Sequence, residues 1–288
     1  MATLGNPQNT IAILNKYGFN FQKKFGQNFL IDTHVLEKII RAANITKDDF
    51  IVEIGPGIGA LTEKILLTSN GDLQYTAVEI DKGLASYLEN DSFIGMNALI
   101  VCSDYLKLDR EDYVNYYDFD FVVSNIPYYV MTPIIKKLLV DCGTAEKMTF
   151  MVEQDAIERI IAKPKTKQYG PLAVLCAVYG TVRKEFSVGP ENFYPAPHTM
   201  SAVITLTKKI FLNENDNFLI TPLFEMFVEG CFAMRRKTLC NNLNSYFGSM
   251  KPNISFLEAL EKMGLNPKVR AEDLNPDDFV ELFTLLLL

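Results

Sequence analysis

The stretch Phe50-Ile51-Val52-Glu53-Ile54-Gly55-Pro56-Gly57-Ile58-Gly59 decides the fold of this chain. A short apolar run leads into three glycines at alternate positions, and a helical pattern over residues 60–67 follows at once. A strand, a glycine turn and a helix in this order form one half of a βαβ unit. The turn alone is a weak sign of a nucleotide site, because it lacks the last glycine of the dinucleotide fingerprint and also serves simple chain reversal.

Strand and helix patterns continue to alternate along the chain. We expect strands at 50–54, 73–79, 98–102, 119–124 and 148–152, with helices at 33–43, 60–67, from 82 onward and at 132–140. This is the pattern of an α/β protein with a parallel, doubly wound, Rossmann-like sheet. Residues 181–188 and 202–207 predict two further strands, which we expect to form an antiparallel pair at the edge of the sheet.

A break in composition at 208–217, which ends in Asn-Glu-Asn-Asp-Asn, predicts a domain boundary. We therefore expect a first domain over residues 1–210, which contains the sheet. A small all-α domain is expected over residues 218–288, with helices near 218–230, 236–247, 254–263 and 276–287.

Composition excludes several classes of protein. Hydrophobic residues at 48% and charged residues at 22% are ordinary for a soluble globule and exclude a disordered chain. The five scattered cysteines and two histidines offer no zinc-ligand spacing, so we expect no metal. The scattered cysteines favour reduced thiols, and no leader or membrane-spanning run is present, so we expect a cytoplasmic protein without a membrane partner.

The net charge of −7 taken alone argues against a nucleic-acid partner, but it conceals an uneven distribution of charge along the chain. Residues 1–31, 159–184 and 231–251 contain no acid at all. These stretches contain the residues that we expect to contact the phosphates of a nucleic acid if one binds, namely Lys23, Lys24, Lys163, Lys165, Lys167, Arg235, Arg236 and Lys237. The three stretches form one positive face if they converge in the fold, and three solvated loops if they do not.

Acidic residues at two predicted strand ends indicate an adenosyl cofactor. Glu79 ends the strand after the glycine turn, where a carboxylate can accept both hydroxyls of a ribose. A glycine turn such as that at Gly55 and Gly57, followed by an acid at the end of the next strand, occurs both in enzymes that use nicotinamide cofactors and in enzymes that use S-adenosylmethionine. Asp104 follows the next strand and is placed to accept from the exocyclic amine of an adenine, which favours S-adenosylmethionine.

Asn125-Ile126-Pro127-Tyr128, at the end of a predicted strand, suits methylation of an adenine amine. Such an amine is a poor nucleophile because its lone pair is delocalised into the ring. The Asn125 side-chain oxygen and a backbone carbonyl of Ile126 or Pro127 can each hold one N–H and turn the lone pair towards a sulfonium methyl. Tyr128 can stack on the flipped-out base. No general base is needed, which agrees with the scarcity of histidine.

Six segments together resemble the small-subunit (16S) ribosomal RNA adenine dimethyltransferases, the KsgA/RsmA family. They are residues 24–30 (KFGQNFL), 52–57 (VEIGPG), 79–81 (EID), 125–128 (NIPY), 190–197 (PENFYPAP) and 235–239 (RRKTL). The resemblance implies a methyltransferase sheet with a helical RNA-binding domain. It also implies a substrate, two neighbouring adenines in the 3′-terminal hairpin loop of 16S rRNA, within a small ribosomal subunit or its precursor. We expect the protein to act as a monomer.

The resemblance also assigns roles to particular residues. It places Asn28 and Leu30 on the cofactor, Gly55 at its amino-acid end, and Asn125 between cofactor and base. Phe193 resembles the family's second aromatic, which faces Tyr128 across the base. His198-Thr199-Met200 stands where the family usually has a basic residue, so one RNA contact differs here.

Two alternatives stay open at this point. A resistance-type methyltransferase of large-subunit rRNA shares the cofactor motifs and the Asn-x-Pro-Tyr element, although residues 235–239 favour the small subunit. A non-catalytic RNA-binding factor could keep the fold, although intact Asn125, Tyr128 and Gly55 speak against lost catalysis.

Overall fold

The computed structural model of the chain describes residues 4–17, 27–46, 48–68, 73–90, 98–109, 119–126, 130–142, 145–209, 221–248 and 252–287. Its main sheet has seven strands in the order β4-β3-β2-β5-β6-β9-β7. They are β2 (Phe50–Ile54), β3 (Gln74–Glu79), β4 (Ala98–Cys102), β5 (Phe121–Asn125), β6 (Lys147–Glu153), β7 (Gly180–Val188) and β9 (Ser201–Lys208). The predicted doubly wound α/β sheet is confirmed.

The order of the strands creates a crevice at the middle of the sheet. From β2 the chain moves outward through β3 and β4, and then returns to the other side of β2 with β5 and β6. All of these neighbours pair in parallel, so their carboxyl ends lie along one edge. In open α/β sheets ligands bind at this edge, where the strand order reverses. The reversal here lies between β2 and β5.

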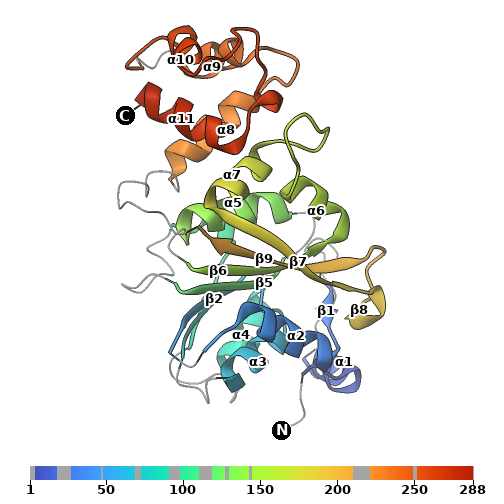
Figure 1. The fold of residues 1–288 in the computed structure, drawn as a ribbon. Coiled ribbons are helices and arrows are strands. Elements are labelled where there is room, and N and C mark those ends of the chain that lie inside the picture. Colours follow the sequence, from blue (N-terminus) through green and yellow to red (C-terminus); the bar gives the residue numbers. More distant parts are fainter. Residues whose placement is uncertain are drawn as a thin grey trace. The chain divides into compact units, whose positions relative to one another are not determined.

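The strands form where their apolar runs can be covered on both faces. Every residue of β2 is buried, as is usual for a central parallel strand. Helices α2 (Thr33–Ala43) and α3 (Ala60–Thr68) pack against each other on one side of the sheet (Figure 1). Asp32 caps α2 by accepting from the Val35 amide at 3.0 Å, and Asn44 ends it in a left-handed conformation.

The remaining elements of this region include several that sequence patterns did not predict. Helices α4 (Lys82–Asn90) and α5 (Met131–Asp141) agree with expectation. Helix α1 (Pro7–Lys16) was not expected, nor were the two-residue strands β1 (Phe29–Leu30) and β8 (Phe193–Tyr194), which pair antiparallel. The expected edge pair corresponds to β9 and β7, and β9 runs antiparallel to β6.

Two compact units make up the chain. The first consists of residues 1–137, 144–154 and 183–207, and the second of residues 138–143, 155–182 and 208–288. The second unit therefore starts its last segment at the predicted composition break, but it also includes residues 155–182. These carry most of α6 (Gln154–Ile160) and all of α7 (Pro171–Tyr179), neither of which was expected.

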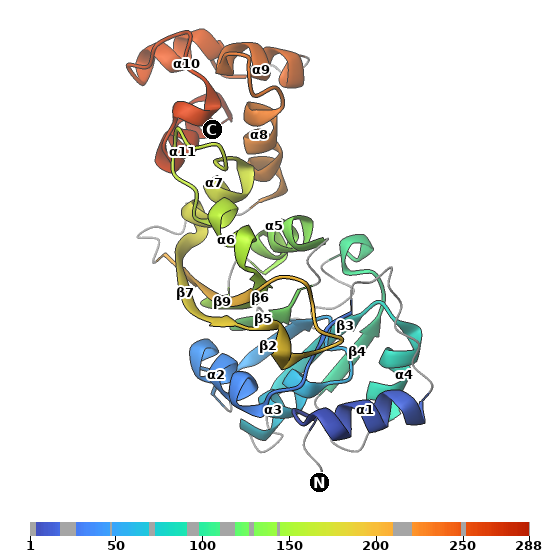
Figure 2. The ribbon, with the colours of Figure 1, turned by 90° about the vertical axis from the view of Figure 1, so that its right-hand side faces the viewer.

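Four further helices of the second unit match the expected ones closely. They are α8 (Pro222–Phe232), α9 (Leu239–Phe247), α10 (Phe256–Lys262) and α11 (Pro276–Leu287). Thr221, Thr238 and Ser255 cap the first three through their side-chain oxygens. Helix α7 lies beside α8 and α11 (Figure 2), and aromatic rings fill the core, with Phe224 and Phe283 edge to face at 5.2 Å. No helix in the described part of the chain is long and apolar enough to cross a membrane.

Candidate active site

A cavity of about 260 Å³ lies at the carboxyl ends of β2, β3 and β5, within the first unit. All seven residues predicted to hold the cofactor line it. They are Asn28, Leu30, Gly55, Gly57, Glu79, Asp104 and Asn125. Segments distant in sequence thus converge on one hollow at the strand-order reversal, where the doubly wound fold places its ligands.

The glycine turn forms one wall of this cavity. Gly55, Gly57 and Gly59 have φ values of 71°, 62° and 84°, a region that side chains rarely tolerate. A Cβ atom on Gly57 would also lie 3.1 Å from the Phe29 ring. The Gly55 amide donates to the Val78 carbonyl at 2.9 Å, which fixes the turn to β3. The turn therefore requires glycine both for its backbone conformation and for close approach.

Glu79 ties the end of β3 to the glycine turn. Its carboxylate accepts from the Gly57 amide at 3.0 Å and from the Asp81 amide at 2.9 Å. The side chain is buried, and this burial raises the pKa of Glu79 above its ordinary value against the opposing effect of the two backbone hydrogen bonds. The carboxylate thus has a fixed position in the cavity wall.

Asp104 stands at the end of the neighbouring strand. The Ser103 amide donates to the Glu79 carbonyl at 2.9 Å, which holds the end of β4 against the end of β3. Asp104 then begins the 3-10 helix η2 (Tyr105–Lys107) by accepting from the Leu106 amide at 3.2 Å. The two predicted cofactor carboxylates therefore lie on adjacent strand ends.

Asn125 ends β5 on the other side of the strand-order reversal. Its side-chain nitrogen Nδ2 donates to the Asn28 carbonyl at 3.3 Å, and the next residue, Ile126, donates its amide to the Met151 carbonyl at 3.2 Å. Because the nitrogen of the Asn125 amide is used in this way, its oxygen Oδ1 is the group left to accept an N–H from a substrate. Asn28, which the family resemblance assigned to the cofactor, also orients Asn125.

Of the two predicted aromatic residues, the structure describes one. Tyr128 lies outside the described residues, as does Pro127. Phe193 is described, on β8, where it pairs with Leu30 of β1. Its side chain is only 3% exposed in an apolar cluster and does not line the cavity.

Glu53 is a cavity residue that the sequence reasoning did not single out. It lies on β2, lines the cavity and is 1% exposed. One of its oxygens accepts from the Tyr75 hydroxyl at 2.6 Å and from the Thr62 hydroxyl at 2.9 Å. Burial raises the pKa of Glu53 to about 7. The signal that could have found it is an acid inside an otherwise apolar buried strand.

Comparison with known proteins identifies the family. The family model described as "Ribosomal RNA adenine dimethylase" matches residues 18–287. The chain belongs to this family of rRNA-modifying enzymes. The match covers both units and confirms the resemblance drawn from the six sequence segments.

Two similar proteins carry the same name, and each matches this chain over almost its whole length. A protein of Lachnoclostridium phytofermentans named "Ribosomal RNA small subunit methyltransferase A" is 41% identical, over 98% of this chain and 97% of its own. A protein of the same name from Listeria monocytogenes is 40% identical, over 98% and 96%.

Two solved structures have the same fold as this chain over about nine tenths of its length. A dimethyladenosine transferase from Plasmodium falciparum superposes with a TM-score of 0.69 at 24% identity, over 89% of this chain and 96% of its own. The 23S rRNA methyltransferase ErmE gives 0.58 at 24% identity, over 90% and 99%.

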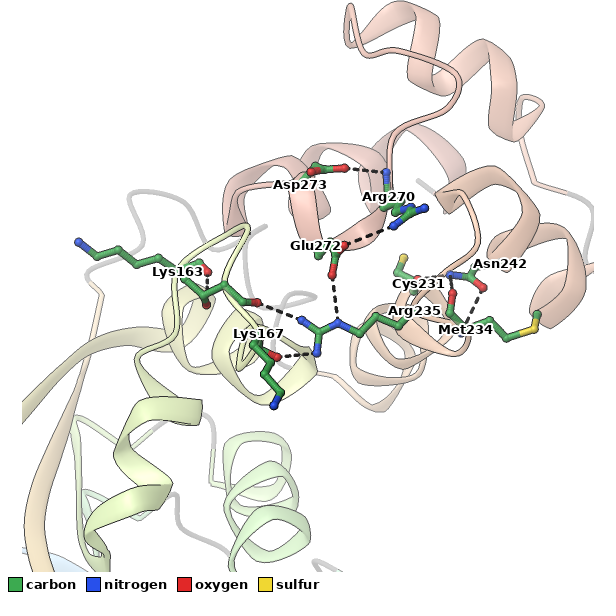
Figure 3. Close-up of polar contacts among 10 residues, drawn as sticks. Lys163, Lys167, Cys231, Met234, Arg235, Asn242, Arg270, Glu272 and Asp273 are labelled. Carbon is green, nitrogen blue, oxygen red and sulfur yellow. Dashed lines mark hydrogen bonds and ion pairs between the residues drawn. The ribbon is translucent and has the colours of Figure 1, made fainter.

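Two of the three basic stretches of the dimethylase meet in the second unit. Lys163, Lys165 and Lys167 lie between α6 and α7, and Arg235, Arg236 and Lys237 lie between α8 and α9. Arg235 joins the two segments, since it donates to the Thr166 carbonyl at 3.0 Å, to the Lys167 carbonyl, and to Glu272 at 3.0 Å (Figure 3). The predicted Lys23 and Lys24 lie outside the described residues.

The raised pKa of Glu53 predicts how stability depends on pH in this dimethylase. An unfolded glutamate loses its proton near pH 4.5, whereas folded Glu53 keeps it to about pH 7. The native state therefore binds more protons across this window, so the free energy of unfolding should fall as pH rises through it, by about 3 kcal/mol. Glu53→Gln should remove that component. Urea unfolding of the parent and of Glu53→Gln, repeated from pH 4 upward, measures this component. If the free energies of unfolding of the two proteins changed in parallel with pH, Glu53 would ionise at its ordinary pKa.

Proposed function

We propose that this protein transfers methyl groups from S-adenosylmethionine to the N6 amines of two adjacent adenines in the 3′-terminal hairpin loop of 16S rRNA. The single observation that carries the proposal is Asn125, whose amide nitrogen is fixed to the Asn28 carbonyl at the edge of the cavity. Family membership and the names of the relatives support an rRNA substrate in the small subunit.

The cavity residues suit an adenosyl cofactor. A carboxylate has about four lone-pair sites, and backbone amides occupy two on Glu79, which leaves acceptors for two ribose hydroxyls. Asp104 would accept from the exocyclic amine of the cofactor's adenine. The absence of a Cβ at Gly55 and Gly57 lets the ligand approach the backbone closely. When bound, the cofactor supplies a methyl group on a positively charged sulfur.

The chain's own residues would act mainly by positioning the target amine. Oδ1 of Asn125 accepts one N–H, and the carbonyl of Ile126 or Pro127 accepts the other, so that the nitrogen lone pair points at the methyl group. The product ammonium is acidic enough to lose its proton to water, so no side chain has to act as a base. Tyr128 would stack on the base, and Phe193 stays a prediction for the opposite side.

RNA affinity should come from phosphate contacts of the second unit. Replacing Arg236 and Lys237 with alanine should lower the slope of log affinity against log salt by ~0.7–0.9 for each lost contact. Cofactor affinity should not change. The measurement is a salt titration of binding to undermethylated small subunits. Lys262→Ala serves as control, since Lys262 pairs with Glu258 at 3.6 Å, and an unaltered slope in the double variant would mean that the segment only packs the helical unit.

The alternatives make different predictions in one experiment. Methyl transfer is assayed on undermethylated small subunits and on large-subunit rRNA, and the modified nucleotide is mapped. We expect two dimethylated adenines in the 3′-terminal loop of 16S rRNA. Modification of large-subunit rRNA would indicate the resistance-type enzyme, and binding without transfer would indicate a non-catalytic factor.

The setting of the reaction is part of the proposal. We propose that residues 1–210 carry the methyl-transfer chemistry, that residues 218–288 bind RNA, and that the protein acts as a cytoplasmic monomer. Support comes from the cavity in the first unit and from the absence of any disulfide among the five cysteines. Sedimentation at micromolar concentration tests the monomer.

A further inference from the structure

The turn at residues 163–166 holds a lysine in a position that favours glycine. The Thr166 amide donates to the Lys163 carbonyl at 3.2 Å, which closes a four-residue turn with Pro164 second and Lys165 third. Lys165 has a φ of 68°. This is the pattern of a type II turn, whose third residue needs a positive φ and is usually glycine or asparagine. A lysine kept there against the backbone preference indicates a use for its side chain.

The same turn is fastened to the helical unit at several points. The Lys165 amide donates to the Glu272 carbonyl at 2.7 Å, in the 3-10 helix η7 (Ala271–Asp273). The buried Tyr169 hydroxyl donates to the Leu274 carbonyl at 2.9 Å. The turn is therefore held in place by contacts far from it in sequence, and its backbone is ordered before any ligand binds.

Arg235 uses its guanidinium group for the protein itself. Its Nε donates to Glu272, and its two terminal nitrogens donate to the carbonyls of Thr166 and Lys167 (Figure 3). Glu272 also lies 3.7 Å from Arg270. The planar fork of arginine can make these three bonds together, whereas a lysine ammonium cannot copy their geometry. The guanidinium group of Arg235 is thus bonded within the protein through all three of its nitrogens, although its side chain is 44% exposed.

The backbone just before Arg235, where α8 ends, is also held in place. Buried Asn242 donates to the Cys231 carbonyl at 2.8 Å and to the Met234 carbonyl at 3.1 Å, and it accepts from the Met234 amide at 3.2 Å. These bonds satisfy carbonyls left open at the end of α8. The residues that follow, Arg236 and Lys237, therefore start from a fixed backbone.

Five exposed cations remain on the two joined segments. They are Lys163, Lys165, Lys167, Arg236 and Lys237, which we call the basic cluster. No ion pair with an acid of the described chain neutralises any of them. Uncompensated cations on an ordered backbone fit the closely spaced phosphates of a folded RNA, whose binding releases counterions.

We propose that Arg235 is a positioning residue that joins the two segments into one phosphate-binding surface, and that Lys165 is a phosphate contact of this surface. The inference rests on the proposed function, since the RNA is the rRNA substrate. It assigns Arg235 a different role from Arg236 and Lys237, with which it forms a continuous basic run.

Replacing Glu272 tests the proposal, because the two explanations predict opposite changes in RNA affinity. If charge alone governs binding, Glu272→Ala removes a negative charge near the cluster and should strengthen RNA binding. If Glu272 helps to hold Arg235 and the turn, the same change should weaken binding. Glu261→Ala is the matched control, because Glu261 is an exposed acid on α10 in the same unit.

Arg235→Lys and Lys165→Gly complete the experiment. Arg235→Lys keeps the charge and loses the fork, so we expect it to bind RNA as weakly as Arg235→Ala. Lys165→Gly relieves the backbone, so we expect a thermal midpoint equal to or above that of the parent, together with a salt slope lower by ~0.7–0.9. Lys165→Gln should lower the slope equally.

The measurement is binding to undermethylated small ribosomal subunits over a range of salt, with far-ultraviolet circular dichroism as a check of folding. Arg235→Lys with parental affinity, or Glu272→Ala with increased affinity, overturns the role of Arg235. An unchanged slope in Lys165→Gly overturns the role of Lys165. If Glu272→Ala does not fold, Arg235→Lys decides. A parent protein without salt-dependent binding to these particles would instead refute the proposed function.

Discussion

Asn125→Ala is expected to slow the methyl-transfer step by ~100-fold or more, while RNA affinity stays nearly unchanged. In the proposed mechanism the substitution removes one of two acceptors that shape the target amine, and such preorganised groups act most strongly in the transition state. In the proposed mechanism phosphates supply most of the RNA affinity, and the base would still stack on Tyr128. Single-turnover methylation at saturating enzyme separates the chemical step from binding.

Asn125→Asp refines this experiment. Aspartate keeps an oxygen acceptor but cannot donate to the Asn28 carbonyl, which Asn125 does at 3.3 Å. If that bond orients the acceptor, the aspartate variant should also be slow. Asn90→Ala, at the end of α4, controls for the loss of an asparagine elsewhere in the first unit. A parental single-turnover rate in folded Asn125→Ala would show that the Asn-Ile-Pro-Tyr turn is structural, and the proposed amine mechanism would have to be abandoned.

The wall of the cavity could be predicted because its residues follow a local rule. Gly55, Glu79, Asp104 and Asn125 each stand at the end of an apolar run or within two residues after it. In a parallel sheet the ends of such runs meet at one edge, so finding the strands also finds the residues of the site. The structure places all four in one cavity. The sequence therefore predicted this part without any long-range information.

Other elements depend on packing that a sequence pattern does not contain. Helix α7 is an almost continuous apolar run over residues 171–179 and is buried on nearly all sides, so its hydrophobicity has no helical period to read. Helix α1 begins with an Asn6 cap but is weakly amphipathic, and a polar chain start conceals it. The membership of α7 in the second unit follows only from its contacts with α8 and α11.

The number of basic residues in a segment does not show which of them are available to a ligand, as Arg235 illustrates. From the sequence, Arg235, Arg236 and Lys237 are equivalent members of one basic run. In the fold, the first is bonded to two carbonyls and to Glu272, whereas the other two are exposed without an ion pair in the described chain. The partners of Arg235 are distant in sequence, and a local pattern cannot show which cation will find them.

Glu79→Ala is expected to weaken binding of S-adenosylhomocysteine by roughly 10- to 150-fold, which corresponds to ~1.5–3 kcal/mol for a charge-assisted hydrogen bond. The carboxylate is fixed by the Gly57 and Asp81 amides, so its remaining lone pairs are preorganised for the ribose hydroxyls. Titration calorimetry with S-adenosylhomocysteine measures the loss directly.

The control for Glu79 has to separate ligand contact from support of the turn, because alanine also releases the Gly57 amide. Glu79→Gln keeps an oxygen acceptor for that amide but loses the charge. Its single oxygen cannot also serve the Asp81 amide, and the glutamine NH2 group cannot accept a hydrogen bond, so the Asp81 amide loses its acceptor. If the carboxylate acts only by supporting the turn through Gly57, the glutamine variant should bind the ligand more tightly than the alanine variant. If the charge acts on the ribose, the two variants should bind the ligand about equally weakly. Binding within about twofold of the parent in folded Glu79→Ala would contradict both roles, because one ribose contact alone should cost about tenfold or more.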